Sequence, residues 1–307
     1  MNRLYRVAGI SKQAHHQQLR RDALLSLEIE ELIVHIDLIR SEHPGCGLEK
    51  LYYTLAPTCM GRDQFIDTFM ALGYRVQYRR NYRRTTFAAG NHFPDLIAGA
   101  LVRSACRVWQ TDITYFDANN RFYYLVFIID IYTKLIVGYC ASEHMRAQAN
   151  IDALKMALHA QKNTQGLIHH SDRGSQYSSK IYLQLLAVHE IIPSMAQMAQ
   201  ENAYAERING TIKNEYLNYK NIKDIKSLKK EVKAAVKHYN EKRLHNALPE
   251  RTTPANFAKQ LVHLSDQQRP MVIVYAKENY KLRQTSSLNQ FRPTTNLLDH
   301  VCPMNNV

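Results

Sequence analysis

The 307-residue sequence lacks a long apolar segment and an N-terminal secretion signal. Its longest apolar run, Phe122–Ile129, ends at Asp130 and is far shorter than the roughly 18 residues that a membrane span requires. The stretch Met1–His16 is polar, without the apolar core of a signal peptide. We therefore expect a protein that has no membrane partner and is located in the cytoplasm.

Cysteine is scarce, and its pattern excludes two kinds of site. The five cysteines are an odd number, and no two stand at C-x-x-C spacing: Cys46, Cys59, Cys106, Cys140 and Cys302. This argues against a disulfide framework and a structural zinc site, and it indicates a reducing compartment. Hydrophobic residues make up 45% and charged residues 22% of the chain, a balance typical of globular domains and not of disordered chains.

The net charge of +13 is distributed unevenly along the chain. Residues 101–206 carry nine basic and nine acidic side chains, whereas residues 207–251 carry twelve basic and five acidic ones. Upstream, five arginines are interleaved with aromatic residues: Arg75, Arg79, Arg80, Arg83 and Arg84. Guanidinium groups beside aromatic rings favour nucleic-acid contacts, so we expect the flanks to hold a polyanion. A requirement for solubility, or a basic linker, would produce a similar composition.

The first hundred residues show helical patterns. Ser11 is suited to cap a helix, and apolar residues between Ala23 and Arg40 follow the 3.6-residue period. After His43-Pro44-Gly45, two short apolar stripes separated by Pro57 and Gly61 predict a helix-turn-helix. Many helical hairpins that bind no DNA share this pattern.

From Arg107 onward the pattern changes to a mixture of strands and helices. Three runs rich in Val, Ile, Tyr and Phe predict consecutive strands: Arg107–Phe116, Phe122–Ile131 and Leu135–Ala141. Helices and short strands then alternate: a helix around Ile151–Leu158, a strand at Leu167–His170, a helix at Ser178–His189, a strand at Ile191–Met195 and a helix from about Asn202. The order β-β-β-α-β-α-β-α predicts an α/β fold, a mixed sheet covered by helices, as in the ribonuclease-H-like fold.

Three carboxylates stand out within this region. Asp112 lies inside the first strand, where aspartate is disfavoured. Asp172 follows the fourth strand, at the edge where open α/β sheets bind ligands. Glu206 shares a helix face with Asn209 and Lys213. Taken singly, each has an ordinary alternative: a hydrogen-bonded strand residue, a turn residue and a solvated helix face.

Together, the segments around these carboxylates resemble the signature blocks of the DDE transposases and retroviral-type integrases: Trp109–Thr114, His170–Tyr177 and Asn202–Lys213. The sequence is most similar to the OrfB proteins of the IS-three family of bacterial insertion sequences. Two further segments resemble that family's helix-turn-helix and C-terminal blocks: His43–Leu48 and Tyr239–Phe257.

One departure from the family pattern concerns the spacing of the last two carboxylates. The 33 residues between Asp172 and Glu206 are slightly fewer than in the family, and the shortfall falls in Ala196–Glu201. We expect the helix that carries Glu206 to keep its place. A rotated helix would move Glu206 away from the metal ions.

The resemblance implies a transposase that cleaves DNA ends and transfers strands by attack of a 3′-hydroxyl. Asp112, Asp172 and Glu206 would be catalytic and would bind two Mg²⁺ or Mn²⁺ ions. Lys213 would hold a DNA phosphate, with Asn209 and Arg207 as further strand contacts. The outer face of a downstream amphipathic helix would follow a duplex backbone through five lysines: Lys223, Lys226, Lys230, Lys233 and Lys237.

We expect three parts in the chain. Residues 1–98 form a helical, helix-turn-helix-like DNA-binding region with an Arg/Tyr-rich linker, residues 99–220 the ribonuclease-H-like catalytic domain, and residues 221–307 a basic helical region and tail. The expected partners are double-stranded DNA, further copies of the chain on DNA and an upstream-frame OrfA segment, with the nucleoid as location. The alternatives are a metal-dependent nuclease on the same fold, or a DNA-binding regulator or degenerate transposase without catalysis.

Overall fold

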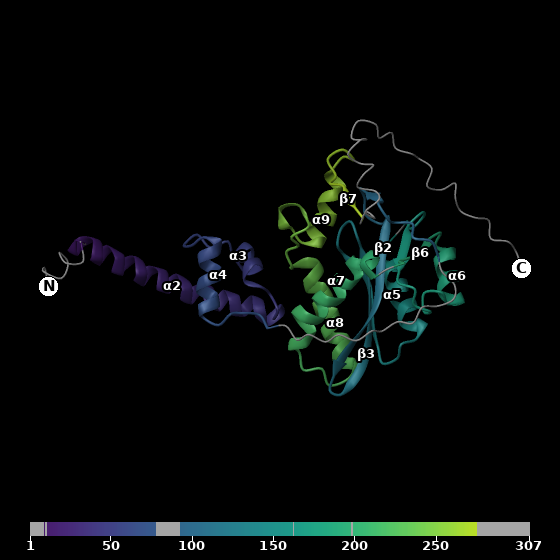
Figure 1. The fold of residues 1–307 in the computed structure, drawn as a ribbon, viewed down its shortest axis with the longest axis horizontal. Coiled ribbons are helices and arrows are strands. Elements are labelled where there is room, and N and C mark those ends of the chain that lie inside the picture. The colour runs from purple at the N-terminus through teal and green to yellow at the C-terminus, as the bar shows by residue number, and fades with distance from the viewer. Residues whose placement is uncertain (1–8, 10, 78–92, 162, 198, 275–307) are drawn as a thin grey trace, which may run out of the picture.

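The computed structural model describes residues 9, 11–77, 93–161, 163–197 and 199–274. A five-stranded mixed sheet of order β4-β3-β2-β5-β6 lies at its centre, and a helical arm projects to one side (Figure 1). The strands are β2 (Val108–Ala118), β3 (Arg121–Asp130), β4 (Ile136–Ser142), β5 (Ile168–Ser171) and β6 (Ile192–Met195). The first three are antiparallel, and β5 and β6 continue the sheet in parallel. The predicted order of strands and helices along the chain and the ribonuclease-H-like fold are confirmed.

The register of the antiparallel part is set by the β2–β3 hairpin. Asn119 and Asn120 form its two-residue loop, both with left-handed φ angles of 53° and 58°. Asparagine tolerates this conformation better than most residues, and such a loop matches the twist of the strands that it joins. The pairing therefore begins at Ala118 and Arg121 and continues without a bulge to Trp109 and Asp130.

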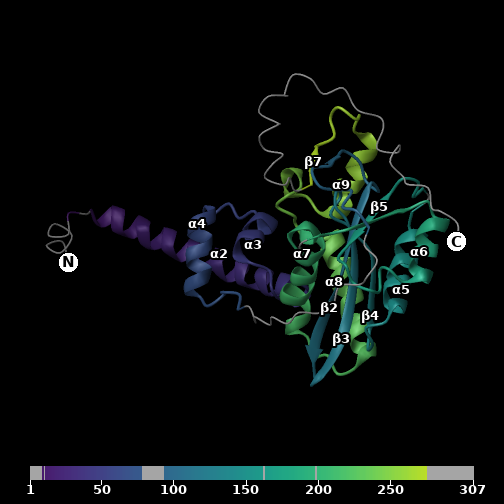
Figure 2. The ribbon, with the colours of Figure 1, turned by 45° about the vertical axis from the view of Figure 1, so that its right-hand side comes forward.

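Helices cover both faces of the sheet because side chains alternate along each strand. On β3, Val126 and Ile128 face one helical layer, whereas Leu125 and Phe127 face the other. The two layers lie on opposite sides of the sheet (Figure 2). The first contains α5 (Ala147–His159) and α6 (Lys180–Val188), and the second contains α7 (Ala203–Thr211) and α8 (Ile225–Glu241).

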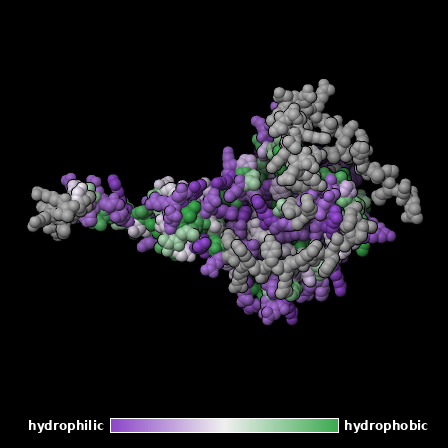
Figure 3. Space-filling model, in the orientation of Figure 1, coloured by the Kyte–Doolittle hydropathy of each residue, from purple (hydrophilic) through white to green (hydrophobic). Residues whose placement is uncertain are grey.

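The arm consists of the predicted N-terminal helices: α2 (Lys12–Glu42), α3 (Leu48–Leu55) and α4 (Arg62–Ala71). Ser11 caps α2, since its Oγ accepts a hydrogen bond from the Ala14 amide at 3.0 Å. Ile36 of α2 packs with Phe65 and Phe69 of α4 in a small core. Apolar side chains also gather on the surface of this arm (Figure 3).

The region after residue 221 is less purely helical than its sequence predicts. It contains α8 and α9 (Pro254–Gln260), but also the short strand β7 (Val272–Ile273). This strand pairs with β1 (Leu101–Val102), so the chain returns to the start of the core. The pairing joins segments about 170 residues apart, which no local pattern indicates.

Four of the arginines predicted to contact DNA lie outside the described residues: Arg79, Arg80, Arg83 and Arg84. Cys302 also lies outside them, whereas Arg75 is described and exposed. Within the described ranges, no helix combines the length and apolar character needed to cross a bilayer.

A buried ion-pair cluster joins the arm to the core. Glu215 lies in a π-helical turn that continues α7. Its carboxylate accepts hydrogen bonds from Nε2 of His43 at 2.7 Å and from Nε and Nη2 of Arg243 at 2.8 and 2.7 Å. The Lys50 ammonium lies 3.8 Å from the same carboxylate. The Gly45 amide donates to the Glu215 carbonyl at 2.8 Å, so His43-Pro44-Gly45 docks directly on the turn.

Close packing and charge make this junction specific. A Cβ at Gly45 would lie 2.5 Å from the Glu215 Cα, so no larger residue fits there. The His43 ring stacks on Tyr216 with centroids 4.5 Å apart. Burial alone would raise the pKa of Glu215, but the hydrogen bonds from Arg243 and His43 hold it well below its usual value. Glu215 is therefore ionised at neutral pH, and His43 must donate to it through Nε2.

Glu215→Gln should lower the free energy of unfolding by about 3 kcal/mol, because it leaves the Arg243 guanidinium buried without a counter-charge. Urea denaturation measures the loss. Glu49→Gln is the matched control, because its ion pair with Arg251 also joins the arm to the core but is solvent-exposed, so the loss should stay below about 1 kcal/mol. Equal losses in the two variants would contradict the anchoring role of Glu215.

Candidate active site

Asp112 and Asp172 stand on neighbouring parallel strands. β2 and β5 pair with Thr111 opposite Ser171, which is the last residue of β5. The next residue of each segment is an aspartate, so the two carboxylates lie side by side at this edge of the sheet. The strand pairing, and not proximity along the chain, brings them together.

Hydrogen bonds orient both aspartates. On Asp112, Oδ1 accepts from the Ile113 amide and Oδ2 accepts from Nδ2 of Asn209, both at 2.9 Å. Oδ1 of Asp172 accepts from the Gly174 amide at 3.1 Å. A Cβ at Gly174 would lie 3.0 Å from that same oxygen, so glycine keeps the turn close to the carboxylate.

Glu206 reaches the same site from the exposed side of α7. Burial, then the charge of Asp172, raises the pKa of Glu206. Burial and the charges of Asp172 and Glu206 together raise the pKa of Asp112 to about 8, against the hydrogen bonds from Ile113 and Asn209. The structure thus places Glu206 near the two aspartates that the sequence pattern singled out, close enough for its charge to raise the pKa of Asp112. That the shorter loop at Ala196–Glu201 leaves the helix of Glu206 in its place stays a prediction.

Two buried amide side chains fasten α7 to β2. Nε2 of Gln110 donates to the Glu201 carbonyl at 3.2 Å, and its Oε1 accepts from the Tyr204 amide at 3.1 Å. Nδ2 of Asn202 donates to the Thr111 carbonyl at 2.9 Å. Because Gln110 and Thr111 immediately precede Asp112, these bonds fix the start of α7 against the strand that carries it.

The predicted DNA-contact residues near the carboxylates lie in three different settings. Nζ of Lys213 donates to Thr114 Oγ1 at 2.7 Å and to the Tyr115 carbonyl at 3.5 Å, which leaves one of its three protons for a ligand. Asn209 is buried and orients Asp112, a role that its position on a helix face did not reveal. Arg207 is exposed and points into a cavity beside α8.

The lysines predicted to follow a duplex are all exposed. They flank or lie on α8, whose start is fixed by a capping box between Asp224 and Ser227. Buried residues such as Leu228 and Val232 hold the opposite face of this helix on the core. The exposed set is Lys223, Lys226, Lys230, Lys233 and Lys237.

Neither His169 nor His170 belongs to the group of carboxylates. His169 shares a hydrogen bond with the Tyr182 hydroxyl at 2.6 Å, and His170 shares one with Ser194 Oγ at 2.9 Å. Burial lowers their pKa values to about 3 and about 4, so both rings are neutral. They hold β5 to its neighbours through these bonds to α6 and β6.

The donor set at the carboxylates fits a hard divalent cation. It consists of carboxylate oxygens and two buried amide oxygens, Oδ1 of Asn209 and Oε1 of Gln176, which have no hydrogen-bond partner in the described part of the chain. Mg²⁺ and Mn²⁺ favour such oxygen ligands. Among the described residues, no three His, Cys, Asp or Glu side chains form a ready-made ligand cluster. Carboxylates without a cation between them repel one another, and the charges of Asp172 and Glu206 add to the effect of burial in raising the pKa of Asp112.

Comparison with known proteins agrees with this geometry. Two family models described as the integrase core domain match residues 103–200 and 190–254. The insertion element IS600 uncharacterized 31 kDa protein of Shigella sonnei is 32% identical over 223 residues, which cover 69% of this chain and 82% of that protein. Transposase InsF for insertion sequence IS3A of Escherichia coli is 39% identical over 88 residues, 29% of this chain and 31% of the relative.

Among solved structures, the catalytic core domain of the HTLV-2 integrase in complex with magnesium aligns with 53% of this chain and 99% of its own. The TM-score is 0.41 and the sequence identity is 19%. The integrase core and the relatives define the protein as a polynucleotidyl transferase. Within this class, the chain belongs to the IS-three family of DDE transposases, which are encoded by insertion sequences.

Gln110→Leu should lower the free energy of unfolding by about 2 kcal/mol, because it leaves the Glu201 carbonyl and the Tyr204 amide unpaired in a buried site. Strand transfer should fall at least about tenfold as α7 loses its fixed position. Urea denaturation and a strand-transfer assay measure the two effects. Gln148→Leu, on the exposed face of α5, is the control and should change neither. A Gln110→Leu variant with normal stability and activity would show that these bonds do not position α7.

Proposed function

We propose that Asp112, Asp172 and Glu206 form the catalytic centre of this transposase and hold two divalent cations. The observation that carries the proposal is their convergence: Asp112 and Asp172 follow paired residues of neighbouring strands, and Glu206 on α7 lies near enough for its charge, after burial and the charge of Asp172, to raise the pKa of Asp112. An uncompensated group of this kind is costly unless a cation is bound. Bound there, Mg²⁺ or Mn²⁺ supplies positive charge to the attacking and leaving oxygens of phosphoryl transfer.

The reaction has two steps at one centre. In the first, water attacks a phosphodiester at the end of the element, and the bond to the leaving oxygen breaks to give a free 3′-hydroxyl. In the second, this hydroxyl attacks a phosphate of target DNA, and the displaced strand leaves with its own 3′-hydroxyl. Both steps depend on positioning and charge neutralisation more than on covalent help from the protein.

The side chains around the carboxylates would position the DNA. Asn209 keeps Asp112 in one orientation through its amide. Lys213 is fixed on β2 by Thr114, and its remaining proton would bind a phosphate beside the reacting one. Lys213 therefore has a defined position before DNA binds. This favours a role in aligning the DNA strand over a role in the overall affinity for DNA.

Most of the affinity for double-stranded DNA would come from the basic flanks. The exposed lysines along α8 and the arginines from Arg75 onward carry charge that the core, with equal numbers of acidic and basic residues, does not provide. Each phosphate contact contributes a slope of about −0.9 to the salt dependence of binding. The helical arm would contact the element ends, and we place the protein with the nucleoid in the bacterial cytoplasm.

Transposition also requires two DNA ends to be held together, which implies more than one copy of the chain. The long helix α2 offers a surface for such contacts, since Leu24, Leu27, Val34 and Leu38 are more than half exposed. These exposed side chains support contact with further copies or with an upstream-frame OrfA segment.

Asp112→Asn, Asp172→Asn and Glu206→Gln should each abolish Mg²⁺-dependent cleavage and strand transfer, with fold and DNA affinity nearly unchanged. Each change removes one negative charge from the proposed metal site and alters volume little. A labelled DNA end from the element, incubated with Mg²⁺, reports both steps. Asp117→Asn, which removes an exposed carboxylate from the same strand as Asp112, should retain full activity. Substantial activity in any of the first three variants would overturn the assignment.

A further inference from the structure

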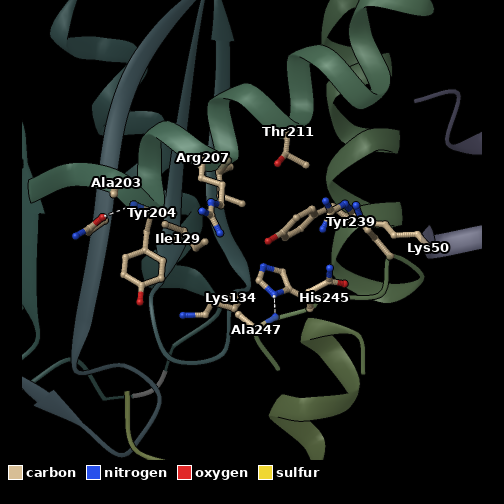
Figure 4. A pocket seen from close by; sticks show the side chains of 14 residues that line it. Lys50, Ile129, Lys134, Ala203, Tyr204, Arg207, Thr211, Tyr239, His245 and Ala247 are labelled. Carbon is tan, nitrogen blue, oxygen red and sulfur yellow. Dashed lines mark hydrogen bonds between the residues drawn. The ribbon is translucent and has the colours of Figure 1, made fainter. Parts of the chain in front are cut away.

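A cavity of about 620 Å³ lies between α7, the end of α8 and the loop that follows. Figure 4 shows that the polar ends of Arg207, Tyr239 and His245 point toward one another across it. Lys50 enters from the arm, and Lys134 lies at the opposite side beside Tyr204. The proposed catalytic centre uses none of the other four polar residues, Tyr239, His245, Lys50 and Lys134. Their convergence therefore requires a separate explanation.

The cavity is strongly cationic. Lys50, Lys134, Arg207 and Arg243 line it. Burial, followed by the charges of all four, lowers the pKa of His245 to about 3, so its ring is neutral and adds no charge of its own. Glu215 neutralises Arg243 and lies near Lys50, while Asp130 offsets part of the charge of Lys134. The cavity therefore retains positive charge and favours an anion.

Two buried groups in the cavity keep hydrogen-bonding capacity that the described residues do not use. Lys134 is only 3% exposed. Its ammonium donates to the Ile131 carbonyl and lies 4.1 Å from the centre of the Tyr204 ring. In the described part of the chain it forms no ion pair with a carboxylate within 4.0 Å, although the charge of Asp130 acts on it. The Tyr239 hydroxyl is buried and has no hydrogen-bond partner among the residues that the structure describes. Both are donors, and both line the cavity.

The cavity lies close to the proposed catalytic centre along both β2 and α7. Gln110 lines the cavity, and Asp112 follows two residues later on the same face of β2, about 7 Å along the strand. Arg207 likewise follows Glu206 on α7. Phosphates of a B-form strand recur at about 3.4 Å of axial rise, so a strand held at the carboxylates carries another phosphate within a few nucleotides of the cavity.

We propose that this cavity binds a phosphate group of the DNA strand held at the catalytic centre, through Arg207, Lys134 and the Tyr239 hydroxyl. The proposal rests on the DNA-joining function proposed above and adds a second phosphate site to it. Lys50 belongs to the arm and the other lining residues belong to the core, so the cavity lies beside the Glu215 junction.

The test measures binding without metal, so it does not depend on catalysis. The full chain is titrated with inorganic pyrophosphate in EDTA by isothermal calorimetry. Arg207→Gln should weaken binding roughly tenfold and Tyr239→Phe roughly threefold, since each removes a donor from the anion. Lys155→Gln, which removes an exposed charge on α5 behind the sheet, is the matched control and should bind like the unchanged protein. Thermal unfolding verifies that each variant is folded.

A competition arm identifies the source of the phosphate. Fluorescence anisotropy of a labelled duplex is followed with pyrophosphate or with NaCl at the same ionic strength. Pyrophosphate should weaken DNA binding more than NaCl does, and Arg207→Gln should abolish this difference.

Three results would overturn the proposal: no pyrophosphate binding, equal weakening by Arg207→Gln and Lys155→Gln, or pyrophosphate binding that leaves DNA affinity unchanged. The last result would assign the cavity to a free phosphate compound. Asp112→Asn should bind pyrophosphate normally, so failure of the cavity proposal is distinguishable from failure of the catalytic assignment.

Discussion

The convergence of three carboxyl groups at one sheet edge is the constraint on which the arrangement of the core depends. Asp112, Asp172 and Glu206 come from β2, from the end of β5 and from α7. The protein holds them there with fixed donors: backbone amides after both aspartates, and the Asn209 amide on Asp112. These bonds only partly offset burial and the charges of Asp172 and Glu206, which together raise the pKa of Asp112 to about 8. A site of this kind favours the binding of cations.

One segment, α7 and the π-helical turn after it, contributes residues to three different sites. One face of this segment carries Glu206 and Asn209 toward the carboxylates, and Arg207 faces the cationic cavity. Its end carries Glu215, which binds the arm through His43 and the region after α8 through Arg243. A displacement of this one segment would therefore move the catalytic centre, the cavity and the junction with the arm together.

The local patterns of the sequence predicted the elements, because alternation and helical periodicity are properties of short segments. The strands around Asp112, the Ser11 cap and the buried face of α8 followed from such patterns. Contacts over long separations did not. The bond between His43 and Glu215 spans 172 residues, and the pairing of β7 with β1 closes a similar loop. Gln110 and Asn209 stood within the signature blocks, but only the folded chain shows that they fasten α7 and orient Asp112.

The most direct test of the central claim is to locate the cation. Crystals of the protein grown or soaked with Mn²⁺ would give an anomalous difference map. The account predicts peaks among the carboxylates of Asp112, Asp172 and Glu206, and their loss or strong weakening in Asp172→Asn crystals of the same form. Peaks elsewhere, with none among these carboxylates at Mn²⁺ concentrations that support strand transfer, would contradict it.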